Sequence, residues 1–215
     1  MARVAAVPAS EAGWMVKLAY RFGPRMMKRL TGRVPEHGLE PMGLFAHIPK
    51  VMMAYFRLEG ATAKLGRLDQ RLGDLAQLKT ATMTHCEYCI DMGSQIGRHR
   101  SGVSDEQLLT LPRYRQSTLF TEEEKLVLDY AVAVSRTPVE VSDELSARLR
   151  EHFDDAQIVE LTHLIALENY RGRFNFALGA GAAGFSEGMV CAQPEPQSDR
   201  SRDDINATSR PPAAA

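Results

Sequence analysis

Apolar residues recur at every third or fourth position along most of the chain, which is the spacing of an α-helix that buries one face. The most regular run extends from residue 65 to residue 96 and includes Leu68, Leu72, Leu75 and Leu78. The strict apolar–polar alternation that is typical of half-buried strands is absent from the sequence. The pattern therefore predicts an all-α fold.

Capping and helix-breaking residues indicate where the later helices begin and end. Thr121 is followed three residues later by Glu124, a capping box that predicts the start of a helix. Pro138 is expected to stop that helix, because proline lacks the amide hydrogen that a further turn requires. A last long helix is expected to begin at Asp155 and to reach about Leu178.

The first expected helix, over residues 14–30, is amphipathic and basic. Its apolar stripe has a spacing of four residues, and basic side chains surround it. Such a helix can pack its stripe on the body of the protein or on a neighbouring subunit, or it can lie on a membrane surface. We favour packing. The stripe consists of Trp14, Leu18, Phe22, Met26 and Leu30.

Composition divides the chain into three segments. Residues 1–40 contain the N-terminal helix and a loop rich in glycine and proline, and residues 41–190 form the main helical domain. From residue 191 onward the sequence is rich in Pro, Ser, Asp and Arg and has no aromatic residue. Such a sequence cannot bury enough apolar surface to fold, so residues 191–215 are expected to form a disordered tail.

The main domain contains a weak internal repeat. Residues 72–106 can be aligned with residues 158–188, so that Cys86 faces Gly172 and Gly93 faces Gly179. Each segment ends in a Gly-x-Ser-acid sequence, at residues 102–105 and 184–187. We therefore expect a duplicated helical unit, of which only the first copy keeps a cysteine pair.

Charge and hydropathy exclude several classes of function. The 215 residues include 26 basic and 27 acidic side chains, so the net charge of −1 creates no field for nucleic acid or an anionic membrane. No segment approaches the roughly 20 apolar residues needed to cross a bilayer, and the N-terminus lacks the apolar run of a secretory signal. We expect a cytoplasmic protein that has neither nucleic acid nor a membrane as a partner.

The most distinctive chemical feature is the pair Cys86 and Cys89, two residues apart. Three cysteines do not make a secreted disulfide framework, whereas a close pair suggests redox or metal chemistry. At a helix N-terminus the backbone N–H groups can stabilise a thiolate. That thiolate can attack a peroxide or a disulfide, and the second thiol can then resolve the product. Proton acceptors near in sequence include His85 and Asp74, which precedes Cys86 by three helical turns.

Other interpretations of these residues remain open. The pair can supply half of a zinc site that His85, Asp91 or His99 completes, or it can fill the core. Arg171 and Arg173 can bind an anion, although a solvated or subunit-bridging role is favoured. Cys191 is expected to be a free thiol without a catalytic part.

Two stretches of sequence resemble a known family. The run from Arg71 through the segment Thr84–Ser94, with the helical second half ending in Arg173–Gly179, is similar to the carboxymuconolactone decarboxylase family in its alkylhydroperoxidase D-like branch. The resemblance covers roughly residues 40–185. It implies an all-α bundle built from a duplicated helical unit and assembled as a homotrimer or homohexamer. The N-terminal helix is then an addition to that bundle.

The resemblance also implies roles for individual residues. Cys89 takes the place of the attacking thiol and Cys86 that of its resolving partner. Asp74 stands where the family's proton relay has an acidic residue, and Gly93 stands where it has a histidine. Because that histidine is missing, His85 or His99 is the candidate base, and Tyr88 is a candidate hydrogen-bond donor to a thiolate or to a peroxide oxygen.

The first hypothesis is a thiol-dependent peroxidase or disulfide oxidoreductase that acts on a hydroperoxide. An external thiol protein or small thiol reduces its disulfide, and it needs no organic cofactor and no metal. The first alternative is a lyase acting on a small lactone or carboxylic acid, which does not depend on a dithiol. We find no cluster of Arg and His that would obviously bind a dicarboxylate. The second alternative is a non-catalytic helical oligomer whose cysteine pair is structural or binds zinc.

Overall fold

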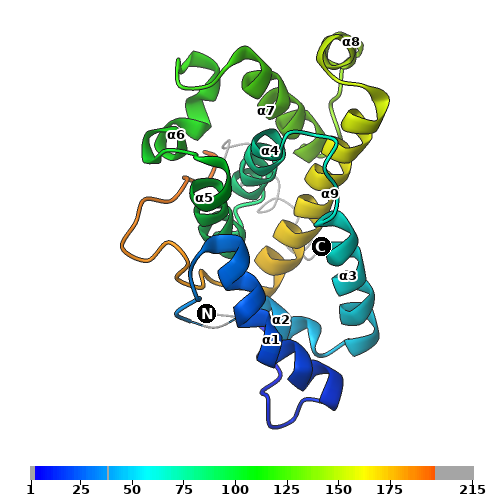
Figure 1. The fold of residues 1–215 in the computed structure, drawn as a ribbon, viewed down its shortest axis with the longest axis vertical. Helices are drawn as coiled ribbons and strands as arrows, with labels where there is room; N and C mark the ends of the chain where they lie inside the picture. Colours follow the sequence, from blue (N-terminus) through cyan, green and yellow to red (C-terminus); the bar gives the residue numbers. More distant parts are fainter. Residues whose placement is uncertain (1–2, 38, 197–215) are drawn as a thin grey trace, which may run out of the picture.

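The computed structural model describes residues 3–37 and 39–196, and all regular elements within these ranges are helical (Figure 1). The all-α prediction is confirmed. In chain order the elements are α1 (Trp14–Thr31), α2 (Glu40–Phe45), α3 (Pro49–Thr62), α4 (Gln70–Met83), α5 (Glu87–Ser101), α6 (Asp105–Thr110), the 3-10 helix η1 (Leu111–Gln116), α7 (Glu122–Ser135), α8 (Asp143–His152) and α9 (Asp155–Leu178).

Helix α4 lies at the centre of the molecule and packs against α5, α7 and α9 (Figure 1). It is buried on more than one side, because it contributes to two hydrophobic clusters. Leu75 and Leu78 pack in the cluster with α5, whereas Leu72 and Ala76 pack in the cluster with α7 and α9. This central helix leads directly to the cysteine pair, so the pair is embedded in the middle of the fold.

Capping residues set the helix ends largely as the sequence predicts. Thr121 forms the predicted capping box with Glu124, and Asp154 forms another as the N-cap of α9, which spans Asp155–Leu178 as predicted. Gly102 and Gly179 end α5 and α9 in the left-handed region, at φ values of 61° and 74°. A residue with a Cβ is strained there, so glycine stops both helices cleanly.

The aligned segments of the predicted repeat differ at their centres. In the first segment the chain breaks between α4 and α5 and Cys86 caps the second helix. In the second segment α9 continues without a break from Asp155 to Leu178, and Gly172 lies within it. The residues around Gly172 include no proline, so every backbone N–H there can continue the helix.

The N-terminal helix packs on the body with a different face from the one expected. Its buried residues are Val16, Gly23 and Thr31, and it contacts α5. The predicted stripe instead points away from the described body, and Trp14 is 74% exposed. Packing of that stripe on a neighbouring subunit stays a prediction.

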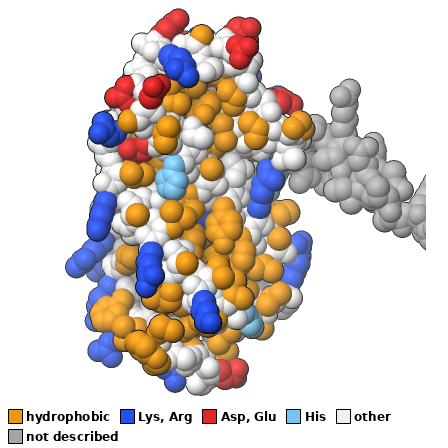
Figure 2. Space-filling model, turned by 90° about the vertical axis from the view of Figure 1, so that its right-hand side faces the viewer, with side chains coloured by type: hydrophobic (Ala, Val, Ile, Leu, Met, Phe, Trp, Pro, Cys, Tyr) orange, Lys and Arg blue, Asp and Glu red, His pale blue; other side chains and the backbone are white. Residues whose placement is uncertain are grey.

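Exposed hydrophobic side chains also occur on α3 and α9, and Figure 2 shows this face of the molecule with a broad hydrophobic area edged by basic side chains. Val51 and Leu58 contribute from α3, and Tyr170 and Phe176 contribute from α9. None of the helices within the described ranges combines the length and hydropathy that crossing a membrane requires.

The segment after α9 is ordered further than the sequence predicts. The backbone N–H of Ala192 donates to the Ser94 Oγ at 3.0 Å, and that of Glu195 donates to the Thr82 carbonyl at 3.1 Å. Ala192 is buried in the cluster around α5. Residues 191–196 therefore belong to the folded body, whereas the rest of the predicted tail, residues 197–215, lies outside the described residues.

The packing of α9 yields a test with matched glycine substitutions. A Cβ on Gly172 would lie 2.1 Å from the Thr84 Oγ1, so we expect Gly172→Ala to lower the free energy of unfolding by about 1–3 kcal/mol. Gly60, within α3, has no atom near its would-be Cβ, so Gly60→Ala should raise the same quantity by about 0.5–1 kcal/mol. Urea unfolding followed by circular dichroism measures both. Equal effects of the two substitutions would contradict the close contact between α9 and Thr84.

Candidate active site around Cys86 and Cys89

The cysteine pair lies where the chain passes from α4 to α5. His85 adopts a left-handed conformation with φ of 55°, which turns the chain sharply after Thr84. Cys86 is the N-cap of α5, and its Sγ accepts a hydrogen bond from the Cys89 N–H at 3.1 Å. The sulfur therefore occupies the position at which a helix N-terminus stabilises negative charge.

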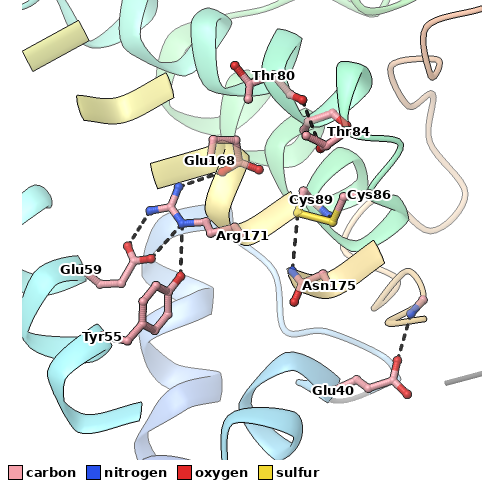
Figure 3. Close-up of a disulfide and its surroundings, with 12 residues drawn as sticks. Glu40, Tyr55, Glu59, Thr80, Thr84, Cys86, Cys89, Glu168, Arg171 and Asn175 are labelled. Carbon is pink, nitrogen blue, oxygen red and sulfur yellow. Dashed lines mark hydrogen bonds and ion pairs between the residues drawn. A yellow bond between two sulfur atoms is a disulfide. The ribbon is translucent and has the colours of Figure 1, made fainter. Parts of the chain in front are cut away.

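Cys86 and Cys89 are joined by a disulfide (Figure 3). Their Cα atoms are 5.2 Å apart, within the ordinary range for such a bond. Cys86 is fully buried and Cys89 is 3% exposed, in a cluster with Tyr88 and Phe185. Burial is common to structural and reactive disulfides, so the polar groups that reach the sulfurs decide between these roles.

One polar side chain from a distant part of the sequence reaches the pair. Asn175, on α9, donates from its Nδ2 to the Cys89 Sγ at 3.6 Å (Figure 3). The side chain is only 5% exposed, and its Oδ1 has no hydrogen-bond partner among the described residues. The Asn169 side chain on the same helix also has such an oxygen, so the contact with the sulfur is what distinguishes Asn175.

A buried network of charged side chains lies on the same face of α9, one turn before Asn175 (Figure 3). Arg171 donates to the Glu59 carboxylate at 2.6 and 2.8 Å and to Glu168 at 2.8 Å. It also donates to the Gln77 Oε1 at 2.9 Å and to the Tyr55 hydroxyl at 3.2 Å.

Two carboxylates already compensate Arg171, so it is not solvated and is not free to bind an anion. Burial raises the pKa of the Glu168 carboxyl, and Arg171 opposes that shift. Arg173 points elsewhere, donating to the Ser135 carbonyl and to the Thr137 hydroxyl.

Asp74 lies far from the disulfide. Its carboxylate accepts a hydrogen bond from the Ser101 hydroxyl, at the last residue of α5. Ser101 follows Cys89 by twelve residues, or about 18 Å along the helix at 1.5 Å per residue. Burial raises the pKa of the Asp74 carboxyl. The structure does not bring this candidate to the cysteines.

The other predicted site residues flank the disulfide in sequence but face different surroundings. His85 lines a separate cavity with Lys79 and Tyr114. Tyr88 is buried with its ring edge against Phe185, at a centroid distance of 6.1 Å. Burial raises the pKa of the Tyr88 hydroxyl, so the group stays protonated in this hydrophobic contact.

The candidate zinc ligands are engaged elsewhere. The Asp91 carboxylate accepts hydrogen bonds from the backbone N–H groups of Ala183, Phe185 and Ser186 at 2.7–3.0 Å, which ties the segment after α9 to α5. The His99 ring packs against Gly32. Within the described part of the chain, the group of side chains with metal-binding spacing is Glu36, His37 and Glu187, which are all exposed and include no cysteine.

Sequence reasoning did not find Asn175 or the Arg171 network. Asn175 is separated from Cys89 by 86 residues, and a single asparagine in an amphipathic helix carries no local signal. One indication was available, because the alignment of the two segments placed Gly172 opposite Cys86. In space the backbone of α9 at Gly172 does approach Thr84, two residues before Cys86.

Comparison with known proteins gives a consistent result. The sequence profile described as the carboxymuconolactone decarboxylase family matches residues 49–133. The Escherichia coli protein YnjA is 38% identical over 161 residues, which covers 74% of this chain and 85% of YnjA. The Bacillus subtilis protein YdfG is 28% identical over 155 residues, which covers 72% of this chain and 99% of YdfG.

Solved structures share the fold. The apo structure of the debrominase Bmp8 superimposes with a TM-score of 0.69 at 18% identity. The similarity covers 85% of this chain and 92% of the Bmp8 chain. A protein of unknown function from Agrobacterium tumefaciens, suggested to be the antioxidant defence protein AhpD, has a TM-score of 0.58 at 27% identity. That similarity covers 62% of this chain and 91% of the Agrobacterium protein.

The position of Asp74 generates a prediction about thiol reactivity. In a Cys86→Ser, Cys191→Ser background, Asp74→Asn should change the rate at which iodoacetamide alkylates Cys89 by less than about twofold. Groups about 18 Å apart are largely screened from one another at physiological ionic strength. The rate is measured by quenching the alkylation at set times and quantifying the alkylated protein by mass spectrometry. A slowing of about a hundredfold would instead place Asp74 in the proton relay.

Proposed function

Since the chain belongs to the carboxymuconolactone decarboxylase family, in its alkylhydroperoxidase D-like branch, we propose that it is a thiol-dependent peroxidase. The observation that carries the proposal is the buried Asn175 amide, which donates to the Cys89 sulfur and keeps an unpartnered oxygen beside it. A dithiol that can close to a disulfide and has a hydrogen-bond donor at one sulfur suits reversible redox chemistry.

The reaction proceeds in two balanced steps. The Cys89 thiolate attacks the terminal oxygen of a hydroperoxide, the O–O bond breaks, and the leaving alkoxide takes a proton to become an alcohol. Cys89 is then a sulfenic acid, which the Cys86 thiol attacks to form the disulfide and release water. An external dithiol supplies the two electrons that reopen the disulfide and is itself oxidised.

Each sulfur has a group that favours its part in these steps. The Asn175 amide stabilises charge on Cys89, and the N-terminus of α5 stabilises charge on Cys86 when it attacks the sulfenic acid. The unpartnered Oδ1 of Asn175 is available to accept a hydrogen bond from the O–H of a hydroperoxide. Asn175 thereby replaces part of what the family's missing histidine supplies at Gly93.

Two alternatives make different demands on the cysteines. A lyase for a small lactone or carboxylic acid keeps its activity when both cysteines are replaced. A non-catalytic oligomer with a structural or zinc-binding pair has no thiol that hydroperoxide oxidises. Assembly as a homotrimer or homohexamer stays a prediction, which the exposed hydrophobic side chains of α1, α3 and α9 support. The identity of the external thiol donor also stays a prediction.

The first test removes each sulfur in turn in a Cys191→Ser background. We expect Cys89→Ser and Cys86→Ser each to lower the rate of dithiothreitol-dependent consumption of cumene hydroperoxide more than about a thousandfold, because the two residues act as one catalytic unit. Consumption of the hydroperoxide at the parent rate by either variant would rule out the proposed cycle. The Cys191→Ser parent serves as the control, since Cys191 is a free thiol outside the pair.

A second test addresses Asn175. With Cys89 as the sole thiol, Asn175→Ala should slow its alkylation at neutral pH about tenfold, because the thiolate loses a hydrogen bond worth about 1.5 kcal/mol. Asn169→Ala is the matched control: Asn169 lies on the same helix, donates to the Ser135 Oγ at 3.0 Å and also has an unpartnered Oδ1. Equal rates in the two variants would show that Asn175 has only a structural role.

A further inference from the structure

A cavity of about 560 Å³ lies beside the C-terminal half of α4 and is separate from the dithiol. Its wall comes from α4, η1, α7 and the segment after α9, and neither Cys86 nor Cys89 contributes to it. Its volume falls within the range of about 300–1,000 Å³ that is usual for small-molecule sites. The charged and polar side chains in the wall are Lys79, His85, Tyr114, Arg115, Gln116, Arg136 and Glu195.

Lys79 is the most unusual of these side chains, because only 1% of its surface is exposed. Its ammonium group forms an ion pair with the Glu195 carboxylate, lies 3.4 Å from the Leu111 carbonyl oxygen and stands 4.8 Å from the centre of the Tyr114 ring. Burial lowers the pKa of the Lys79 ammonium, and Glu195 opposes that shift. A buried ammonium is costly unless an anion accompanies it, so this position requires a carboxylate or its equivalent.

More cations than anions line the wall, but each cation has an ion-pair partner. Lys79, Arg115 and Arg136 are the three cations, and Glu195, the one carboxylate among the described lining residues, pairs with Lys79. Arg115 and Arg136 are paired with Asp129 and Glu140, which stand outside the wall of this cavity. The remaining wall includes apolar side chains of Met83, Pro112 and Val132. The cavity wall therefore combines cationic side chains with an apolar region.

Glu195 comes from the end of the described chain and not from a helix. Figure 1 shows the orange segment after α9 rising along α5 toward α4. Near its end the segment is held by the Ala192 contact to Ser94, the Glu195 backbone contact to Thr82 and the Lys79 ion pair.

From this arrangement we infer that the cavity binds a small molecule with a carboxylate and an apolar body. The ligand carboxylate pairs with Lys79, and Glu195 holds that place when no ligand is bound. The inference goes beyond the peroxidase proposal and does not depend on it, since neither cysteine takes part. Because Glu195 competes with the ligand from within the chain, the apparent dissociation constant equals the intrinsic one divided by the fraction of time that Lys79 is free of Glu195.

Calorimetric titration of the full chain with benzoate tests the inference, and benzamide serves as the neutral probe of the same shape. Removal of the internal competitor in Glu195→Ala should tighten benzoate binding by at least about tenfold relative to the unchanged chain. Benzamide should not bind to either protein detectably, because it lacks the charge that Lys79 requires. Lys79→Met should abolish benzoate binding in the Glu195→Ala background.

Lys125→Met, which removes a lysine paired with Glu122 on α7, is the control and should bind benzoate as the unchanged chain does. Equal benzoate affinity with and without Glu195, binding of benzamide as strong as that of benzoate, or retention of binding in Lys79→Met would each overturn the inference. If Lys79→Met does not fold, the comparison of Glu195→Ala with the unchanged chain and the benzamide titration decide the question by themselves.

Discussion

The site depends on the close approach of α9 to the turn that precedes Cys86. Gly172 has no side chain, so the backbone of α9 lies against Thr84 with no room for a Cβ. Asn175 follows three residues later on the same helical face, and this register brings its amide to the Cys89 sulfur. A wider spacing between α9 and this turn would leave the sulfur without its polar contact.

The same packing explains why the disulfide is buried and yet has hydrogen-bond donors at both sulfurs. The central helix α4 delivers the chain to Cys86, and α5 begins there with its N–H groups directed at the sulfur. Asp91 then fastens the segment after α9 over α5 through three backbone N–H groups. The surroundings of the pair are mostly hydrophobic, so the few hydrogen bonds to the sulfurs act in a medium of low polarity, where they are strong.

Local signals in the sequence predicted most of the fold and the position of the cysteines. The capping box at Thr121, the start of α9 at Asp155 and the cysteine pair at a helix N-terminus all follow from residues close together in the chain. Asp74 needs the tertiary structure to be placed. Sequence spacing puts it three turns before Cys86, but α4 ends at Met83, and the Asp74 carboxylate contacts Ser101 at the far end of α5.

Contacts between distant segments could not be predicted in this way. The Asn175 contact with Cys89 and the Lys79 ion pair with Glu195 join residues 86 and 116 positions apart. Basic residues that are scattered in the sequence gather at one cavity only because α4, η1 and α7 meet there. Polar side chains inside these helices have no spacing that distinguishes a functional group from a surface residue.

Counting thiols after a single turnover tests the peroxidase account most directly. The fully reduced chain has three cysteine thiols. One molar equivalent of cumene hydroperoxide should remove two of them, join Cys86 to Cys89 as identified by peptide mass, leave Cys191 reduced and yield one equivalent of the alcohol. Survival of all three thiols, or consumption of the hydroperoxide while Cys86 and Cys89 stay reduced, would contradict the account.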